Sequence, residues 1–165
     1  MRKKRLDGGP VSAAARPSAQ GALPWPVHAS ISAVAEWVDA RLAARVFVGL
    51  IGVVCIFQLT LALGAPWARF AMGGAYPDAY PPEMRLVALG QVVLLATTAR
   101  VVLNRARFAG GSGRRLARGS TWAIAGLFLV GFGLNLISPS EGERLLWAPV
   151  ALVLSLTAAR VAASR

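Results

Sequence analysis

The chain has 165 residues, of which 56% are hydrophobic and only 15% are charged. Soluble domains carry about 45–50% apolar and about 25% charged residues, so this composition excludes an ordinary soluble domain and indicates a membrane protein. The net charge of +11 would fit a nucleic acid partner or a membrane surface, depending on where the basic residues lie. One cysteine, Cys55, and one histidine, His28, exclude an internal disulfide and leave too few ligands for a Cys/His metal site. We therefore expect no metal and no cofactor.

Residues 1–29 show no apolar periodicity, and they contain MRKKR followed mainly by Gly, Pro, Ser and Ala. This composition predicts a disordered basic N-terminal tail. No apolar segment follows the basic residues, so we do not expect a cleavable signal peptide here.

Residues 30–45 are predicted to form a juxtamembrane amphipathic helix. Apolar residues recur at spacings of three and four, and the charged residues fall away from that stripe. Two arrangements remain open. The helix either lies on the membrane surface or extends the next helix into the cytoplasm.

Residues 46–165 contain four hydrophobic segments, each near the length of roughly 20 residues that a bilayer requires. Arg100 and Arg160 lie near segment ends, where their side chains can reach the headgroups. The predicted fold class is therefore an all-α, integral membrane, up-and-down bundle of four transmembrane helices with a disordered tail. The predicted spans are about 46–63, 86–104, 121–137 and 145–163.

The distribution of Lys and Arg predicts the orientation of this bundle. With these spans, 15 basic residues fall on one side of the membrane and three on the other. Cytoplasmic segments carry the excess of Lys and Arg, so we expect a multi-pass protein of the bacterial inner membrane with both termini in the cytoplasm. The basic residues then meet anionic lipids at the cytoplasmic face, and nucleic-acid binding is the weaker explanation.

The connection over 64–85 is longer than an ordinary helix–helix loop and holds five large side chains, from Trp67 to Tyr80. We expect it to fold back over the outer mouth of the bundle as a lid. The alternative is that its aromatic residues enter the lipid headgroups beside the bundle. We expect the lid and the second outer connection to meet through seven residues: Trp67, Arg69, Arg85, Glu141, Glu143, Arg144 and Trp147.

The second outer connection also carries a helix-start signal. Ser140 followed by Glu143 matches a capping box for the fourth span, and Arg69 and Arg85 are expected to pair with Glu141 and Glu143.

Three side-chain amides, Gln58, Gln91 and Asn135, are predicted at a similar depth near the outer ends of three spans. With Ser138 they form a candidate outward-facing ligand pocket under the lid. The more ordinary explanation is hydrogen bonding between packed helices. Small residues, including a stripe along the fourth span, are expected to line helix contacts in the core, or alternatively a homodimer face.

Three segments carry a resemblance: GAPWARFAMGG after the first span, PPEMRLVAL at the start of the second, and LNLISPSEGERLLWAPVALVL across the last two. They resemble a family of small bacterial four-helix integral membrane proteins over roughly residues 46–160. The resemblance implies a fold and a membrane location, and it implies no activity.

No charged residue lies at the centre of a span, and no span carries a histidine, which leaves few groups for catalysis in the membrane. We therefore expect a non-enzymatic accessory subunit or a binder of small or lipidic molecules, with a homo-oligomer or a membrane protein as possible partner. An oligomeric small-molecule transporter or channel is the alternative. A membrane-embedded hydrolase that uses outer-loop carboxylates, such as Asp78 or Glu83, is the third class.

Overall fold

The protein is an all-helical, multi-pass membrane protein, as the sequence predicts. The structure is a computed structural model that describes residues 26–107 and 114–164. Its long helices are α1 (Pro26–Ala62), α2 (Pro82–Arg107), α3 (Arg114–Leu136) and α4 (Glu141–Ala163), with two 3-10 helices, η1 (Ala68–Phe70) and η2 (Met72–Gly74), between α1 and α2. Each long helix contains a segment long and apolar enough to cross a membrane. The predicted fold class is therefore confirmed.

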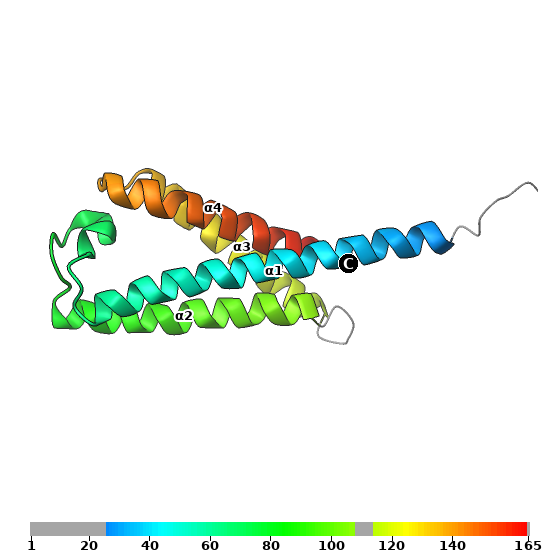
Figure 1. Ribbon diagram of the computed structural model, residues 1–165, viewed down its shortest axis with the longest axis horizontal. Coiled ribbons are helices and arrows are strands. Elements are labelled where there is room, and N and C mark those ends of the chain that lie inside the picture. Colours follow the sequence, from blue (N-terminus) through cyan, green and yellow to red (C-terminus); the bar gives the residue numbers. More distant parts are fainter. Residues whose placement is uncertain (1–25, 108–113, 165) are drawn as a thin grey trace, which may run out of the picture.

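Helix α1 differs most from its predicted bounds. It begins at Pro26, so residues 26–29, assigned to the tail, are helical, and residues 30–45 continue into the first span without a break. The remainder of the predicted tail, 1–25, lies outside the described residues. With 37 residues, α1 is about 55 Å long, well beyond the roughly 30 Å of a hydrocarbon core. Its first turns project past the other helices (Figure 1), so residues 30–45 extend the first span, and their cytoplasmic location stays a prediction.

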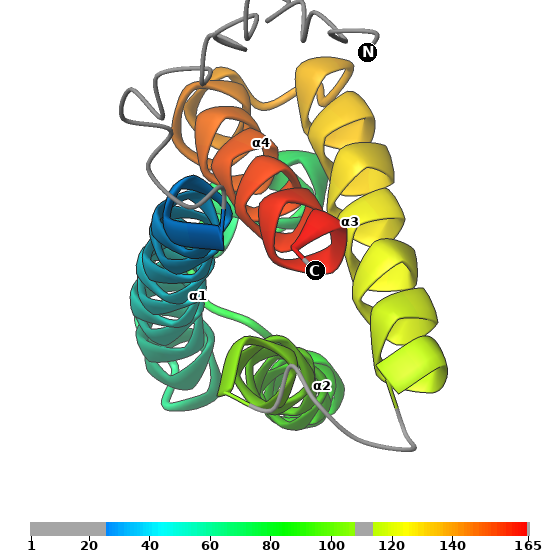
Figure 2. The ribbon, with the colours of Figure 1, turned by 90° about the vertical axis from the view of Figure 1, so that its right-hand side faces the viewer.

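The four helices form two antiparallel hairpins. Helix α1 packs along α2, and α3 packs along α4, while α4 also lies beside α1 (Figure 2). The two hairpins separate toward the end where η1 and η2 lie (Figure 1). We call this the lid end. The opposite end, where α2 ends and α3 begins, is the basic end, because arginines cluster there.

The main core lies in the basic half of the bundle. Phe47 of α1, Val102 of α2 and Val161 of α4 are fully buried there and belong to one apolar cluster. The ring of Phe47 meets Phe128 of α3 edge to face, with 5.6 Å between the ring centroids. All four helices therefore contribute to a continuous apolar core in this half.

The small residues expected to line helix contacts are buried on α4 but mostly exposed on α1 and α3. The stripe on α4 is buried in the bundle, as expected: Ala148, Ala151, Ser155, Ala158 and Ala162. The Ser155 hydroxyl also donates a hydrogen bond to the carbonyl of Ala125 on α3, at 2.9 Å. Core contacts were also expected for the small residues of the first and third spans, and this was wrong for Gly49 and Gly52 of α1 and Gly126 and Gly133 of α3, which are exposed on the surface. For these glycines the alternative, a homodimer face, stays a prediction.

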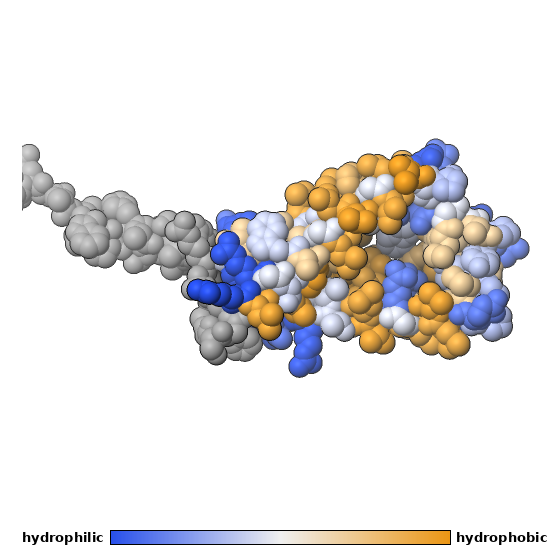
Figure 3. All heavy atoms as spheres, turned by 180° about the vertical axis from the view of Figure 1, so that it is seen from behind, coloured by the Kyte–Doolittle hydropathy of each residue, from blue (hydrophilic) through white to orange (hydrophobic). Residues whose placement is uncertain are grey.

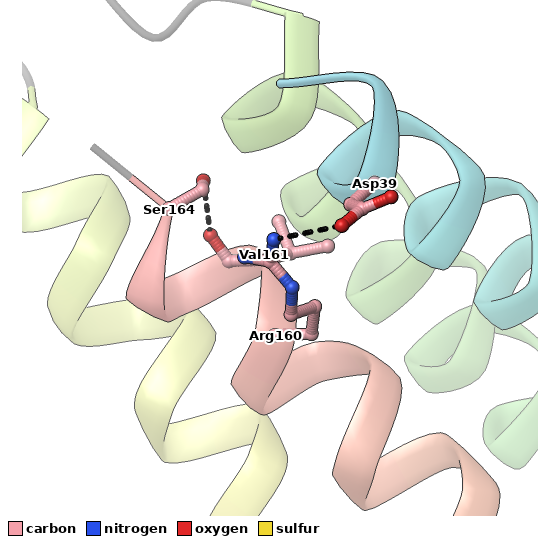
Figure 4. Close-up of polar contacts among 4 residues, drawn as sticks. All are labelled: Asp39, Arg160, Val161 and Ser164. Atoms are coloured by element: carbon pink, nitrogen blue, oxygen red, sulfur yellow. Dashed lines mark hydrogen bonds and ion pairs between the residues drawn. The ribbon is translucent and has the colours of Figure 1, made fainter. Parts of the chain in front are cut away.

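Polar contacts at the basic end join α4 to α1 and α2. Arg160 pairs with Asp39 at 3.4 Å, and the Ser164 hydroxyl donates to the carbonyl of Val161 at 2.8 Å (Figure 4). The guanidinium of Arg105, which is only 2% exposed, donates to the carbonyl of Ser164. These contacts fix the last turn of α4 against α2.

Candidate functional site

Because α2 already begins at Pro82, the lid in the structure is residues 64–81 of the predicted connection, 64–85. The lid has its own small apolar cluster. The backbone N–H of Ala68 donates to the carbonyl of Asp78 at 3.0 Å and closes the loop. Ala68 and Tyr80 are buried against Leu61 of α1 and Ala88 of α2. The lid is therefore an ordered extension of the α1–α2 hairpin.

A left-handed turn carries the lid toward the other hairpin. Met72, Gly73 and Gly74 have φ values of 54°, 70° and 78°. A Cβ atom on Gly73 would lie 3.3 Å from Pro139, and one on Gly74 would lie 3.3 Å from the Cβ of Ser140. Glycine suits both positions, because it adopts positive φ without strain and permits this close approach.

Three hydrogen bonds join the lid to the start of α4. The indole N–H of Trp147 donates to the carbonyl of Phe70 at 2.7 Å, and the Ser140 hydroxyl donates to the carbonyl of Arg69 at 2.9 Å. The backbone N–H of Gly73 donates to a carboxylate oxygen of Glu143 at 2.7 Å. Two of these acceptors are lid carbonyls and one donor is a lid N–H, so the lid makes all three bonds through its backbone.

Ser140 caps α4, but only half of the predicted capping box forms. The Ser140 hydroxyl oxygen accepts a hydrogen bond from the N–H of Glu143 at 3.3 Å. The carboxylate of Glu143 does not return to the N–H of Ser140, which instead donates to the Ser138 hydroxyl at 3.3 Å. One oxygen of Glu143 accepts from both the Ser138 hydroxyl, at 2.6 Å, and the Gly73 N–H. Glu143 therefore links α4 to the lid.

The arginines near the lid make contacts other than the ion pairs predicted with Glu141 and Glu143. Arg85 donates to the carbonyl of Tyr80 at 2.9 Å, and the guanidinium of Arg69 lies over the Phe70 ring, 5.0 Å from its centroid. Arg144 donates to the carbonyl of Ser138 at 2.9 Å. Backbone carbonyls and an aromatic face take the place of the expected carboxylates, because Glu143 is already occupied by neutral donors.

A cavity of about 350 Å³ lies beneath the lid, between the two hairpins. Most of its wall is apolar, formed by Phe57, Leu95, Phe128, Leu154 and similar residues. Its polar lining consists of Gln58, Tyr80, Gln91, Thr98, Asn135 and Glu143. We call this the lid-end cavity.

The three predicted amides all line this cavity, and none of them bridges two helices. Asn135 donates back to the carbonyl of Gly131 in its own helix, at 2.9 Å. Gln91 is exposed on α2, whereas Gln58 is only 8% exposed. Within the described ranges the Gln58 side chain has no hydrogen-bond partner. Ser138 is buried but does not line the cavity, and it acts through its bond to Glu143.

Tyr80 supplies a neutral hydroxyl group near the lid. Burial raises the pKa of this phenol, and the negative charge of Glu143 and the neighbouring Tyr76 raise it further. The two tyrosine rings meet edge to face with 5.3 Å between their centroids. The Tyr80 hydroxyl therefore stays protonated throughout the physiological pH range.

Some residues of the site carry no clear sequence signal. Trp147 was expected to meet the lid, but the sequence does not predict that its indole N–H bonds the carbonyl of Phe70 or that its ring lies 4.7 Å from that of Phe57. Tyr80 is one of several loop aromatics in the sequence, and only the fold shows that it is buried while Trp67 stays exposed. The helix-start position of Glu143 was its only available signal.

Comparison with protein-family models, curated proteins and solved structures gave no match to this chain. The resemblance to small bacterial four-helix membrane proteins therefore stays an expectation from the sequence. The function has to be argued from the geometry of the lid-end cavity.

Proposed function

We propose that the protein binds a small lipidic molecule in the lid-end cavity. The observation that carries this proposal is Gln58, a residue only 8% exposed that lines the cavity and makes no hydrogen bond within the described residues, so that its amide is available to a ligand. A polar group without a partner costs about 1–3 kcal/mol when it is fully enclosed. Gln58 is largely buried but not fully enclosed, and a ligand with a hydrogen-bonding group beside it recovers part of that cost.

The size and lining of the cavity support the same proposal. Ligand pockets of roughly 300–1,000 Å³ are typically apolar with a few convergent polar groups. The lid-end cavity, at about 350 Å³, has this character. Its apolar walls suit a hydrocarbon chain, and its amides suit a polar headgroup.

Transport has less support. A conduit needs a polar path to both ends of the bundle, but the basic half is filled by the apolar cluster around Phe47, Val102 and Leu154. The polar groups of the cavity therefore do not continue through the basic half, and no polar path joins the two ends of the described bundle.

Hydrolysis by the carboxylates near the lid also has less support. Asp78, Glu83 and Glu141 are exposed. Glu143, the one carboxylate in the cavity lining, already accepts hydrogen bonds from Gly73 and Ser138. The described residues contain no pair of carboxylates facing each other across the cavity.

We further propose that the basic end faces the cytoplasm of a bacterial cell and that the lid faces outward. The 15 to 3 distribution of basic residues supports this orientation. A periplasm-active reporter fused within the lid at residue 75 should then be active, and the same reporter fused at residue 165 should be inactive. The reverse pattern would overturn the orientation without affecting the cavity.

Ligand retention by the purified full chain tests the proposed function. Native mass spectrometry after mild detergent extraction should show a bound molecule on the wild type and about tenfold less on Gln58→Leu, because the leucine removes the hydrogen-bonding group while keeping the side-chain size. Thr97→Val is the matched control, since Thr97 is exposed, bonds only to Val93 of its own helix and lies outside the cavity. Absence of any bound molecule from the wild type, or equal retention by Gln58→Leu, would overturn the proposal.

A further inference from the structure

The lid-end cavity is closed on one side and open on the other. None of the described lining residues on α1 and α4 is exposed: Gln58, Ala151 and Leu154 are at most 8% exposed, and the others are partly buried. On α2 and α3, Leu95 and Thr98 are buried, but Leu94 at 56%, Leu127 at 52% and Leu134 at 61% are open to the surroundings. The cavity therefore opens sideways, between α2 and α3.

The opening faces the region that lipid occupies around a membrane-spanning bundle. The two helices that flank it pack mainly against α1 and α4, and they have little contact with each other. Figure 3 shows this face hollowed toward the lid end, with apolar surface on both sides of the hollow. A molecule already dissolved in the bilayer thus reaches the cavity without crossing water, while the lid covers the cavity at the end of the bundle.

The charges of the lining restrict the headgroup. No lining residue is Lys, Arg or His, and the one charged lining residue is Glu143. An anionic headgroup would be buried near a carboxylate with no cation to neutralise it, which is strongly unfavourable. Phosphate and carboxylate headgroups are therefore excluded.

The amides favour an uncharged headgroup over a cationic one. Gln58, Gln91 and Asn135 carry both donors and acceptors, and they pair best with groups that also carry both, such as hydroxyls and amides. The Glu143 oxygen that points to the lid is already bonded by Gly73 and Ser138. Glu143 also lies in the first turn of α4, where the helix N-terminus stabilises its negative charge, so it does not need a cationic headgroup as a counter-ion.

We propose that the ligand is a single-chain amphiphile with an uncharged hydroxyl- or amide-bearing headgroup, and that it enters from the bilayer between α2 and α3. This inference rests on the proposed function and specifies its ligand class and access route. The volume, at the lower end of the range for ligand pockets, supports one chain instead of two. The headgroup lies beside Gln58 and Asn135 under the lid, and the chain follows the apolar wall toward the opening.

Two glycines of α3 provide a matched pair of variants for the test. Gly131 lines the cavity and Gly133 does not, because two residues correspond to a rotation of about 200° around a helix. A Cβ atom at either position would meet no atom within 4 Å. Gly131→Leu therefore has room for its Cβ and adds apolar bulk to the cavity, and Gly133→Leu adds the same side chain on the outer surface.

The experiment measures binding of three probes that share one chain: monooleoylglycerol, oleate and oleylamine. The full chain is reconstituted in nanodiscs of saturated phosphatidylcholine at pH 7, and bound probe is counted by native mass spectrometry. We expect monooleoylglycerol to bind at least about tenfold more tightly than oleate and also more tightly than oleylamine. Gly131→Leu should lose about tenfold in affinity for monooleoylglycerol, and Gly133→Leu should stay within about twofold.

Access from the bilayer has a separate kinetic test. Leu94→Trp narrows the opening, whereas Val93→Trp places the same ring at a neighbouring exposed position outside the cavity. Uptake of monooleoylglycerol from the bilayer should be slower in Leu94→Trp and unchanged in Val93→Trp. Equal uptake rates in the two variants would overturn the route between α2 and α3.

The remaining outcomes separate this inference from the proposed function. Tighter binding of oleate or oleylamine, lost in Gly131→Leu, would overturn the uncharged headgroup and leave the lipid-binding function standing. Equal effects of Gly131→Leu and Gly133→Leu would show that the probes bind outside the cavity, which overturns the inference. Failure of all three probes, together with no molecule on the wild type extracted from cells, would overturn both.

Discussion

The two halves of the bundle are held together in different ways. In the basic half, apolar side chains from all four helices fill the interior, and Phe47, Val102 and Val161 are inaccessible. In the lid half, the hairpins separate around a cavity, and hydrogen bonds from Glu143, Ser140 and Trp147 to the lid join them. Close packing specifies the helix bundle in one half, and directional polar contacts hold an incompletely filled space in the other. The ligand that we propose would therefore occupy the lid half, where the interior is not filled by side chains.

Two phenylalanines of α1 give the largest expected contrast between the halves. Phe47 is fully buried in the core, whereas Phe57 is partly buried and already borders the cavity. Phe47→Ala should destabilise the protein by about 3–5 kcal/mol, because it leaves a void in a packed core. Phe57→Ala should cost clearly less, since it enlarges an existing space. Chemical unfolding of each variant in the same detergent measures the difference, and equal losses would contradict the contrast.

The contact between the lid and α4 should be sensitive to a single methyl group. A Cβ atom on Gly142 would lie 2.6 Å from the ring of Phe70. Gly142→Ala should therefore displace Phe70 and destabilise the protein by about 1–3 kcal/mol, the usual cost of overpacking. Gly133→Ala is the control, because its Cβ meets no atom within 4 Å, and it should be neutral or stabilising. Thermal unfolding that ranks Gly142→Ala at or above Gly133→Ala in stability would mean that the lid is not seated on α4.

The cap of α4 should contribute a smaller amount. The Ser140 hydroxyl accepts from the Glu143 N–H and donates to the carbonyl of Arg69. Ser140→Ala should cost about 0.5–2 kcal/mol, the usual effect of losing an N-cap. Ser120→Ala, which removes a hydroxyl of a partly buried serine that bonds only within its own helix, is the matched control. Equal unfolding midpoints for the two variants would mean that the Ser140 cap does not contribute measurably to the stability of α4.

The smallest effect is expected at the basic end. The ion pair between Asp39 and Arg160 joins side chains that are 65% and 37% exposed. Exposed pairs contribute about 0–1 kcal/mol, so Asp39→Asn should change stability by less than about 0.5 kcal/mol and lose this effect at high salt. A loss comparable to that of Phe47→Ala would mean that electrostatic contacts, not core packing, hold the basic half together.

The sequence predicts well those features of the fold that the surrounding lipid bilayer determines. Four apolar segments and the Ser140 signal at the start of the fourth predict the bundle, since a bilayer permits few other structures for such segments. The amides Gln58, Gln91 and Asn135 were predicted near one depth, and they do line one cavity, because helix geometry fixes depth along the bundle axis.

The contacts that sequence does not predict depend on how the hairpins meet. The pairing of Arg69 and Arg85 with carboxylates is plausible from charge alone, but Glu143 bonds Gly73 and Ser138 instead. The charges in a sequence do not indicate which donor reaches a carboxylate. Here the left-handed turn at Gly73 brings a backbone N–H to Glu143. The exposed glycines of α1 and α3 show the same point, because composition does not reveal which face of a helix its neighbours cover.

The central claim is that Gln58 is retained for a ligand at the expense of stability. Its most direct test is thermal unfolding of delipidated wild type and Gln58→Leu, each with and without monooleoylglycerol. Without lipid, Gln58→Leu should be more stable by about 1 kcal/mol, because a buried amide that lacks a partner is removed. Lipid at about 100 times the wild-type Kd should stabilise the wild type by about 2.7 kcal/mol and Gln58→Leu, which binds about tenfold more weakly, by only about 1.4 kcal/mol. A Gln58→Leu variant that is less stable than the wild type without lipid, and equally stabilised by lipid, would contradict the account.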